Sequence, residues 1–148
     1  MLLDFLLTVG SNSHKKVEKF QFDRMRWTSL GEYPFLNQSV SYAPIIYFQT
    51  AFYIIGGYSD YADQKMIARM DLDGHWTQVG ELNQAKSGHN VIYDGEYLIV
   101  VGGGSYQFTE KCTIKNESVT CTSQNPELAS YYLYPELFLV TENYCKIQ

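Results

Sequence analysis

The sequence predicts an all-β protein built from repeated four-stranded antiparallel sheets, and three observations support this prediction. The apolar runs of the 148-residue chain are short, about four to eight residues each, and Gly, Asp, Asn or Ser separates them, as in strands joined by turns. Aromatic residues make up 16% of the chain, with 13 Tyr and 8 Phe, and these favour the half-buried surface of a sheet. Short phrases also recur along the chain at a nearly constant interval.

Three pairs of expected strands are joined by tight turns, which predicts β-hairpins. The clearest covers residues 90–101, where Asp94 and Gly95 can adopt the positive φ angles of a type I′ turn. Residues 70–77 and 112–121 predict two further hairpins. Helical periodicity is nearly absent, so loops are expected between the paired strands.

The recurring phrases indicate a repeat of about 46–50 residues. WTSLGEY at 27–33 returns as WTQVGEL at 76–82, which is 49 positions later. An apolar strand ends in Gly-Gly at 56–57 and again at 102–103, 46 positions later, and a weaker copy ends at Gly10. Each repeat is expected to hold four strands, with the glycines where backbones pack closely and the Trp between neighbouring sheets. The residues expected to carry the repeat are Gly56, Gly57, Gly102, Gly103, Trp27 and Trp76.

This organisation resembles the kelch repeat of β-propellers, in which an apolar run into Gly-Gly is followed by a Trp about 20 residues later. Gly57 and Trp76 carry the resemblance in one unit, and Gly103 and Val119, which stands in place of the Trp, carry it in the next. The resemblance implies a kelch-type β-propeller fragment of four-stranded antiparallel blades, two complete and two partial. The complete blades are expected at residues 38–82 and 85–123, and the partial blades at 1–33 and 131–148.

A closed propeller typically has about four to eight blades, and two whole blades with two partial ones fall short of a ring. The resemblance therefore implies a fragment of a larger propeller, a degenerate terminal part of one, or a chain that closes by association. We favour the first of these. Residues 1–148 are accordingly expected to form a single partial propeller.

The cysteines bear on the cellular compartment. If Asn116 and Glu117 form a two-residue turn, Cys112 lies directly opposite Cys121, at a position where facing side chains approach closely. A cross-strand disulfide is therefore a candidate, and it favours an extracellular or secretory setting over the cytoplasm. The alternative is two small buried thiols. Cys145 is left over, either free or paired with a cysteine that this sequence does not contain.

Two sites match the acceptor sequence for N-glycosylation. Asn37 and Asn116 each begin an N-x-Ser motif, and the second lies at the expected tip of a hairpin, where a glycan fits. About one such match is expected by chance from so short a motif. The two sites therefore agree with the disulfide prediction but add little to it.

Composition argues against two classes of partner. The net charge is −5 and Lys and Arg do not cluster, which argues against binding to nucleic acid. No apolar run approaches the roughly 20 residues of a membrane-spanning helix. Residues 1–10 are expected to form a strand and not a signal peptide, because an Asp interrupts the run and no basic segment or small-residue cleavage site flanks it.

The sequence predicts no catalytic, cofactor-binding or metal site. His14, His75 and His89 are scattered and lack metal-ligand spacing, and common nucleophile and phosphate-loop motifs are absent from the sequence. The loops between the second and third strands are instead aromatic, which suits recognition of a protein partner. Ordinary loop packing is the alternative. The candidate partner-binding residues are Tyr58, Asp60, Tyr61, Tyr106 and Phe108.

The preferred function is a non-catalytic kelch-repeat protein-interaction module that presents inter-strand loops to a partner. One alternative is part of a propeller enzyme related to copper oxidases, whose metal requires converging Tyr and His ligands, and fold alone does not decide between the two. A second alternative is the substrate-recognition part of an intracellular adaptor, which predicts a BTB-type domain elsewhere in the full-length protein. Metal analysis distinguishes the copper-oxidase alternative from the non-catalytic module, because such an oxidase carries stoichiometric copper.

Overall fold

The computed structural model describes residues 5–11, 14–35, 39–103, 108–124 and 132–137. Every regular element within these residues is a β-strand, which confirms the all-β class. The strands are β1 (Phe5–Ser11), β2 (His14–Gln21), β3 (Arg26–Glu32), β4 (Ile45–Phe48), β5 (Ala51–Ile55), β6 (Tyr58–Ser59), β7 (Ala62–Asp63), β8 (Met66–Asp71), β9 (Trp76–Glu81), β10 (His89–Tyr93), β11 (Leu98–Gly102), β12 (Thr109–Lys115) and β13 (Ser118–Gln124).

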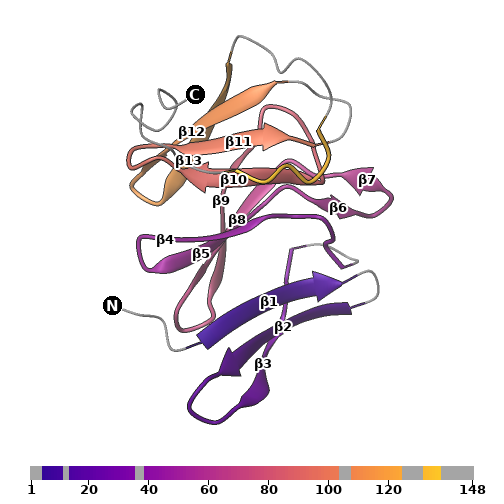
Figure 1. Cartoon of the computed structure of the whole chain (residues 1–148), viewed down its shortest axis with the longest axis vertical. Helices are drawn as coiled ribbons and strands as arrows, with labels where there is room; N and C mark the ends of the chain where they lie inside the picture. Colours follow the sequence, from indigo (N-terminus) through magenta and orange to yellow (C-terminus); the bar gives the residue numbers. More distant parts are fainter. Residues whose placement is uncertain (1–4, 12–13, 36–38, 104–107, 125–131, 138–148) are drawn as a thin grey trace, which may run out of the picture.

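Three groups of strands are stacked along the long axis of the molecule (Figure 1). The first sheet contains β1, β2 and β3 in that order. The central unit of β4, β5, β8 and β9 lies next to it, and the C-terminal unit of β10 to β13 lies at the far end. Within each group, neighbouring strands pair antiparallel. The short hairpin of β6 and β7 projects from the central unit.

The central and C-terminal units join into one curved, nearly closed sheet of eight strands. β13 pairs in parallel with β9, where Val119 lies opposite Gly80. A side chain on Gly80 would clash with the Val119 carbonyl, so glycine permits this close approach. At the other junction, the edge strands β4 and β10 meet where the rings of Phe48 and Tyr93 are 4.2 Å apart. This arrangement is compatible with a propeller fragment in which two four-stranded sheets face each other.

The central unit is buried on both faces, as the alternation along β5 shows. Ala51, Tyr53 and Ile55 belong to the hydrophobic core shared with the C-terminal unit. Phe52 and Ile54 belong to the core shared with the first sheet. Successive side chains of a strand point to opposite faces, so a strand covered on both sides reads as a continuous apolar run. All residues of β5 are accordingly buried.

The 46-residue interval reappears as a repeated backbone contact. A side chain on Gly56 would meet the carbonyl of Lys86 at 2.7 Å, and one on Gly102 would meet the carbonyl of Tyr132 at 2.6 Å. The weaker copy at Gly10 makes the same contact with the linker that follows the first sheet. The ends of β1, β5 and β11 therefore each pack on the next linker, and glycine is needed because a Cβ would clash with that backbone.

β10 and β11 form the first predicted hairpin, but with a longer turn than predicted. Tyr93 pairs with Leu98, so four residues connect the strands where a two-residue turn at Asp94-Gly95 is expected. The Asp94 carboxylate accepts the N–H groups of residues 96 and 97, at 2.9 and 2.8 Å. This local capping by a side chain stabilises the wider turn.

Strand register identifies the equivalent positions of the three groups. Leu6, Phe52 and Leu98 follow one another at intervals of 46 residues on β1, β5 and β11, the second strands of the expected four-stranded repeat, and β2, β8 and β12 are its third strands. These residues pair across the sheet with Phe20, Met70 and Cys112, respectively. The register therefore aligns the third strands without any assumption about loop length.

The same register corrects the predicted counterpart of the two tryptophans. Trp27 and Trp76 lie opposite the third-strand residues just aligned, and the residue opposite Cys112 is Cys121. The prediction of Val119 at this position is therefore wrong. The β12–β13 hairpin is longer than its counterparts, with the two cysteines 9 positions apart, so simple spacing points to a residue too early in the chain. The Cys112–Cys121 disulfide therefore stands where Trp27 pairs with Phe20 and Trp76 pairs with Met70.

Candidate partner-binding face

The linkers that lead into successive units are hydrogen-bonded to each other. Gly88 donates its N–H to the carbonyl of Tyr42 at 2.9 Å, and Tyr134 donates its N–H to the carbonyl of Gly88 at 2.6 Å. The three residues are 46 positions apart, so equivalent points of three linkers are joined in series. Their φ angles are 55°, 63° and 54° in chain order, which shows that the three linkers share one backbone conformation here.

Tyr42 and Tyr134 hold a backbone conformation that favours glycine. For a residue with a Cβ, the left-handed region costs roughly 1–2 kcal/mol, and such residues concentrate at functional sites. The two rings lie 5.8 Å apart and are 50% and 60% exposed. Gly88 lies next to this pair, where an added Cβ would be 3.3 Å from the Tyr134 ring. The equivalent position of the middle linker therefore leaves room for the two exposed rings.

The β6–β7 hairpin brings three of the predicted residues to the same region. Tyr58 exchanges two backbone hydrogen bonds with Ser41, at 2.7 and 2.9 Å, which fixes the hairpin beside Tyr42. Asp60 and Tyr61 form its turn with φ angles of 52° and 61°, as in a type I′ turn. Tyr61 is 84% exposed and Tyr58 is 39% exposed. The hairpin thus presents aromatic side chains to solvent from a fixed base.

Several hollows surround Tyr42. One of about 380 Å³ lies between Tyr42 and the β6–β7 hairpin, and Tyr58, Asp60 and Tyr61 line it. A second of about 330 Å³ extends toward the first sheet, and a third of about 230 Å³ reaches Tyr134. We call the surface of Tyr42, Tyr58, Asp60, Tyr61 and Tyr134 the aromatic face.

Sequence reasoning identifies the hairpin residues of this face but misses Tyr42 and Tyr134. A signal for them exists, because the two tyrosines lie two repeat intervals apart and each comes shortly before a proline. The repeat is recognised from its glycines and tryptophans, and these leave the linkers without an assigned role. The aromatic face is therefore larger than the predicted loops.

The second predicted loop is placed only in part. Tyr106 lies outside the described residues, as do Asn37 and Cys145. Phe108 is half-buried, and its carbonyl accepts a hydrogen bond from a buried lysine at 3.3 Å, so its described contact belongs to the interior. Asn116 is exposed at the tip of the β12–β13 hairpin, where the sequence predicts a glycan.

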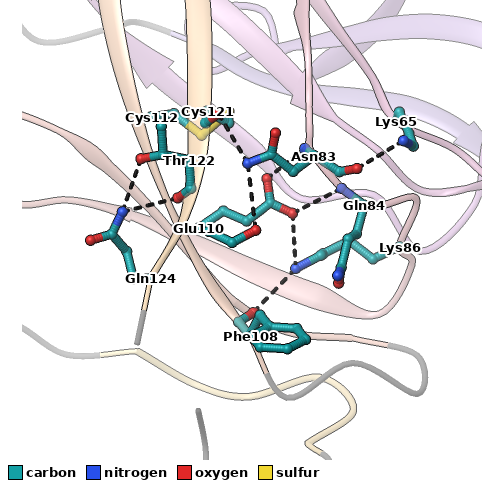
Figure 2. Close-up of polar contacts among 11 residues, drawn as sticks. Lys65, Asn83, Gln84, Lys86, Phe108, Glu110, Cys112, Cys121, Thr122 and Gln124 are labelled. Atoms are coloured by element: carbon teal, nitrogen blue, oxygen red, sulfur yellow. Dashed lines mark hydrogen bonds and ion pairs between the residues drawn. A yellow bond between two sulfur atoms is a disulfide. The ribbon is translucent and has the colours of Figure 1, made fainter. Parts of the chain in front are cut away.

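A buried ion pair fixes the linker between the central and C-terminal units (Figure 2). Lys86 Nζ lies 3.3 Å from Glu110 Oε1, and both side chains are fully buried. The Glu110 carboxylate also accepts the backbone N–H groups of Asn83 and Gln84, at 2.8 and 3.2 Å. Each charge thus has partners, as burial requires. These contacts hold the linker against β12 just before it reaches the aromatic face.

A disulfide lies in the same region (Figure 2). Cys112 and Cys121 are joined with an S–S distance of 2.08 Å and lie directly opposite each other, in the register predicted from the turn. The turn residues Asn116 and Glu117 have φ angles of 49° and 64°. The Asn83 side chain donates to the Cys121 carbonyl at 3.0 Å. The cross-linked hairpin and the linker therefore belong to one polar network.

His89 has an interior role. It is buried, and neither ring nitrogen has a hydrogen-bond partner in the described part of the chain. Burial, and after it the positive charge of Lys86, lowers the pKa of His89 to about 4, so the ring is neutral at neutral pH. The ring fits against Gly56, where an added Cβ would lie 2.9 Å from it. His89 thus packs the second strand of one unit against the start of the next.

A cluster of two acidic residues and a histidine closes the β8–β9 turn. Asp71, Asp73 and His75 offer possible ligand atoms within 4.8 Å of one another. Asp71 Oδ1 accepts the N–H groups of His75 and Asp73, at 2.9 and 3.0 Å, and the bond from His75 contributes most to lowering the Asp71 pKa. These hydrogen bonds of the β8–β9 turn explain why the three side chains lie close together, so we assign the cluster no metal.

The described residues define an all-β chain with a curved, nearly closed sheet and an exposed aromatic face, an architecture compatible with a propeller fragment. No family model matches the chain, and no curated protein matches its sequence. In the described ranges there is no helix long and apolar enough to cross a membrane.

Proposed function

We propose that this chain is a non-catalytic kelch-repeat propeller module that binds a protein partner through its aromatic face. The repeated packing of the second strand on the next linker, at an interval of 46 residues, supports a propeller of this kind. The antiparallel order of the central and C-terminal units is also that expected of four-stranded blades. Such a scaffold fixes the backbone of its linkers while their side chains stay exposed.

The observation that carries the proposal is the gathering of exposed tyrosines around hollows that all share Tyr42 in their lining. The tyrosines are Tyr42, Tyr58, Tyr61 and Tyr134. Tyr suits protein recognition because it offers a large contact area, loses little side-chain entropy and carries a hydroxyl. Tyr42 and Tyr134 also adopt an unfavourable positive φ, at a position where the middle linker has Gly88. Tyrosine is thus kept at both positions although glycine would avoid the strain, which points to a role for the exposed ring.

The charge of the face narrows the chemistry of the partner. Asp60 is exposed and lines the 380 Å³ hollow together with Tyr58 and Tyr61. A carboxylate in this position favours a hydrogen-bond donor or a cation on the partner. We therefore expect a partner segment that combines an apolar side chain with a basic one.

Selection of displayed random peptides on the immobilised chain tests this function. We expect enriched peptides to bind the Tyr58→Ser/Tyr61→Ser variant at least about tenfold more weakly than the wild type, because the variant lacks two exposed aromatic contacts. Leu72→Ser is the matched control, since it removes an apolar side chain of 45% exposure at the opposite end of β8. Failure to enrich peptides, or peptides that bind all three proteins equally, would contradict the proposal.

Metal analysis tests the enzyme alternative. His14, His75 and His89 begin β2, close the β8–β9 turn and begin β10, so they come from three different groups of strands. After incubation with copper and dialysis, we expect the purified chain to retain no stoichiometric metal. One copper ion per chain would overturn the non-catalytic assignment.

The proposal also assigns the chain to an oxidising compartment, because Cys112 and Cys121 form a disulfide and Asn116 is exposed at a hairpin tip. Mass spectrometry of the native protein, with and without reductant and with and without glycan removal, tests this. We expect the cysteines to be modified by a thiol reagent only after reduction. Free thiols at both positions in the native protein would contradict the assignment.

A further inference from the structure

One face of the central unit is buried by the first sheet. This face shows how a unit packs against the unit that precedes it in the chain. Phe52 and Met70 lie on this face and are 6% and 2% exposed. Trp76 lies beside them and packs edge-on against Tyr33, which follows β3, with ring centroids 5.0 Å apart. These apolar residues form the contact between neighbouring units.

Of the equivalent residues of the first sheet, two are exposed and the third is half-buried. By strand register, Leu6, Phe20 and Trp27 occupy the positions of the three residues just described, and we call their surface the Trp27 face. Leu6 is 54% exposed and Trp27 is 48% exposed. The Phe20 ring contacts those of Trp27 and Phe22, at 5.2 and 5.6 Å, so the aromatic residues already form a cluster. An exposed apolar patch of this kind marks an interaction surface.

A carboxylate on the Trp27 face repeats the buried one of the C-terminal unit. Glu18 pairs with Thr8, and Glu110 pairs with Val100. Each residue of the second pair lies 92 positions after its counterpart in the first pair. Glu110 accepts two backbone N–H groups from the linker that arrives from the preceding unit. Glu18 is half-buried and holds the position to accept such a linker. The face thus matches the contact with a preceding unit in polar as well as apolar residues.

The C-terminal unit offers the complementary surface. Leu7 and Val9 of β1 pack on the core between the first sheet and the central unit. Ile99 and Val101 occupy the same positions on β11, two repeat intervals later, and both are half-buried. They alternate along the strand with the buried Leu98 and Val100, so they point away from the central unit. β11 therefore repeats the apolar surface with which β1 covers its neighbour.

We infer that a second copy of this chain docks the Ile99 and Val101 side of its C-terminal unit on the Trp27 face. The contact is the same head-to-tail packing that joins the first sheet to the central unit within one chain. Because the two surfaces differ, the contact is heterologous and repeats until a ring closes. Two copies supply six groups of strands, which lies within the four to eight blades of closed propellers. Such closure by association is the third of the alternatives drawn from the sequence, and here it replaces the first. It is independent of the aromatic face.

Light scattering and sedimentation of the full chain test the inference. We expect the wild type to be a dimer at micromolar concentration, and Trp27→Ser to raise the dimer Kd roughly thirtyfold or more, as for a central interface tryptophan. Leu72→Ser, which removes a similarly exposed apolar side chain from the β8–β9 turn, should leave the Kd unchanged. A cooperative urea transition of each variant verifies that it is folded.

Mixing two variants separates head-to-tail packing from a symmetric contact between two Trp27 faces. Ile99→Asp removes the complementary surface and is expected to be monomeric, with Ile99→Ser as the milder substitute if the Asp variant unfolds. A mixture with Trp27→Ser keeps one intact interface, so we expect heterodimers. A monomeric wild type, a Trp27→Ser variant that dimerises normally, or a mixture that fails to associate would overturn the inference, and open-ended oligomers would overturn the two-copy ring.

Discussion

At the scale of single residues, the linker between the central and C-terminal units concentrates the buried polar groups. Lys86 is fully buried with Glu110, and His89 is buried three residues later. A buried ion pair adds little stability over an apolar pair of the same shape, but an unpaired buried charge is costly. Substitutions in this segment are therefore expected to have large effects on stability.

Glu110→Gln is expected to lower the free energy of unfolding by about 3–5 kcal/mol, because it leaves the Lys86 ammonium buried without a counter-charge. Lys86→Met should cost a similar amount, and the double variant should cost less than the sum. Urea unfolding measures all three. Glu117→Gln is the matched control, since its ion pair to Arg69 has the same 3.3 Å distance but the Glu117 side chain is 73% exposed, and the expected loss is below about 1 kcal/mol. Equal losses at the two sites would contradict the role of burial.

Acid should weaken the fold through His89. Its folded-state pKa of about 4 lies below the ordinary 6.5, so between these values the unfolded chain binds the proton more strongly. The stability from the neutral ring is fully present above pH 6.5 and is lost as the pH falls toward 4, by up to about 3 kcal/mol. In urea unfolding across this range, His89→Gln should flatten the pH dependence, whereas His14→Gln, at an exposed position, should not. An unchanged slope in His89→Gln would rule out this residue as the cause.

At the scale of elements, turn chemistry and strand register decide what sequence reasoning could predict. The all-β class follows from short apolar runs, and the pairing of Cys112 with Cys121 follows from one turn at Asn116 and Glu117. The tryptophan counterpart was not predictable from spacing, because the hairpins differ in length. Phe20 pairs with Trp27 and Met70 with Trp76, whereas Cys112 pairs with Cys121 across a longer hairpin.

The linker residues of the aromatic face could not be predicted from the sequence for a different reason. The exposure of Tyr42 and Tyr134 depends on positive φ angles that hydrogen bonds between residues 46 positions apart hold in place. Local propensity disfavours such angles for tyrosine. Only the placement of the three linkers side by side explains them, and that placement follows from the stacking of whole units.

The disulfide is expected to stabilise the β12–β13 hairpin at the position where Trp27 pairs with Phe20 and Trp76 pairs with Met70 in the equivalent hairpins. Replacing Cys112 and Cys121 together by Ala should lower the free energy of unfolding by about 2–3 kcal/mol, because the cross-link restricts the unfolded chain. Reductant should destabilise the wild type by a similar amount in urea unfolding and leave the double variant unchanged. A wild type insensitive to reductant would show that the cross-link adds no stability.

At the scale of the whole molecule, the described strands form an arc of stacked sheets in which each group contacts its neighbours along the chain. Stability in such a stack is approximately a sum of terms within units and terms between neighbours. The first sheet has a single neighbour among the described residues, and its other side is the Trp27 face. A partner that covers the Trp27 face should therefore stabilise the first sheet more than the other two units.

The proposed association predicts that thermal unfolding depends on protein concentration. Because a partner binds only the folded chain, the Tm of the wild type should rise as the concentration increases. The Tm of Trp27→Ser should rise less over the same range, and Leu72→Ser should behave like the wild type. A wild-type Tm that does not change with concentration would contradict head-to-tail packing between copies.

The series of hydrogen bonds from Tyr42 through Gly88 to Tyr134 bears on how this surface diversifies. The bonds join backbone N–H and C=O groups, so a residue other than proline can form them at each of the three positions. Under the proposed function, a substitution there changes which partner the aromatic face binds while the backbone bonds between the linkers remain. The positive φ angle sets the cost of such an exchange, because a residue with a Cβ is strained there.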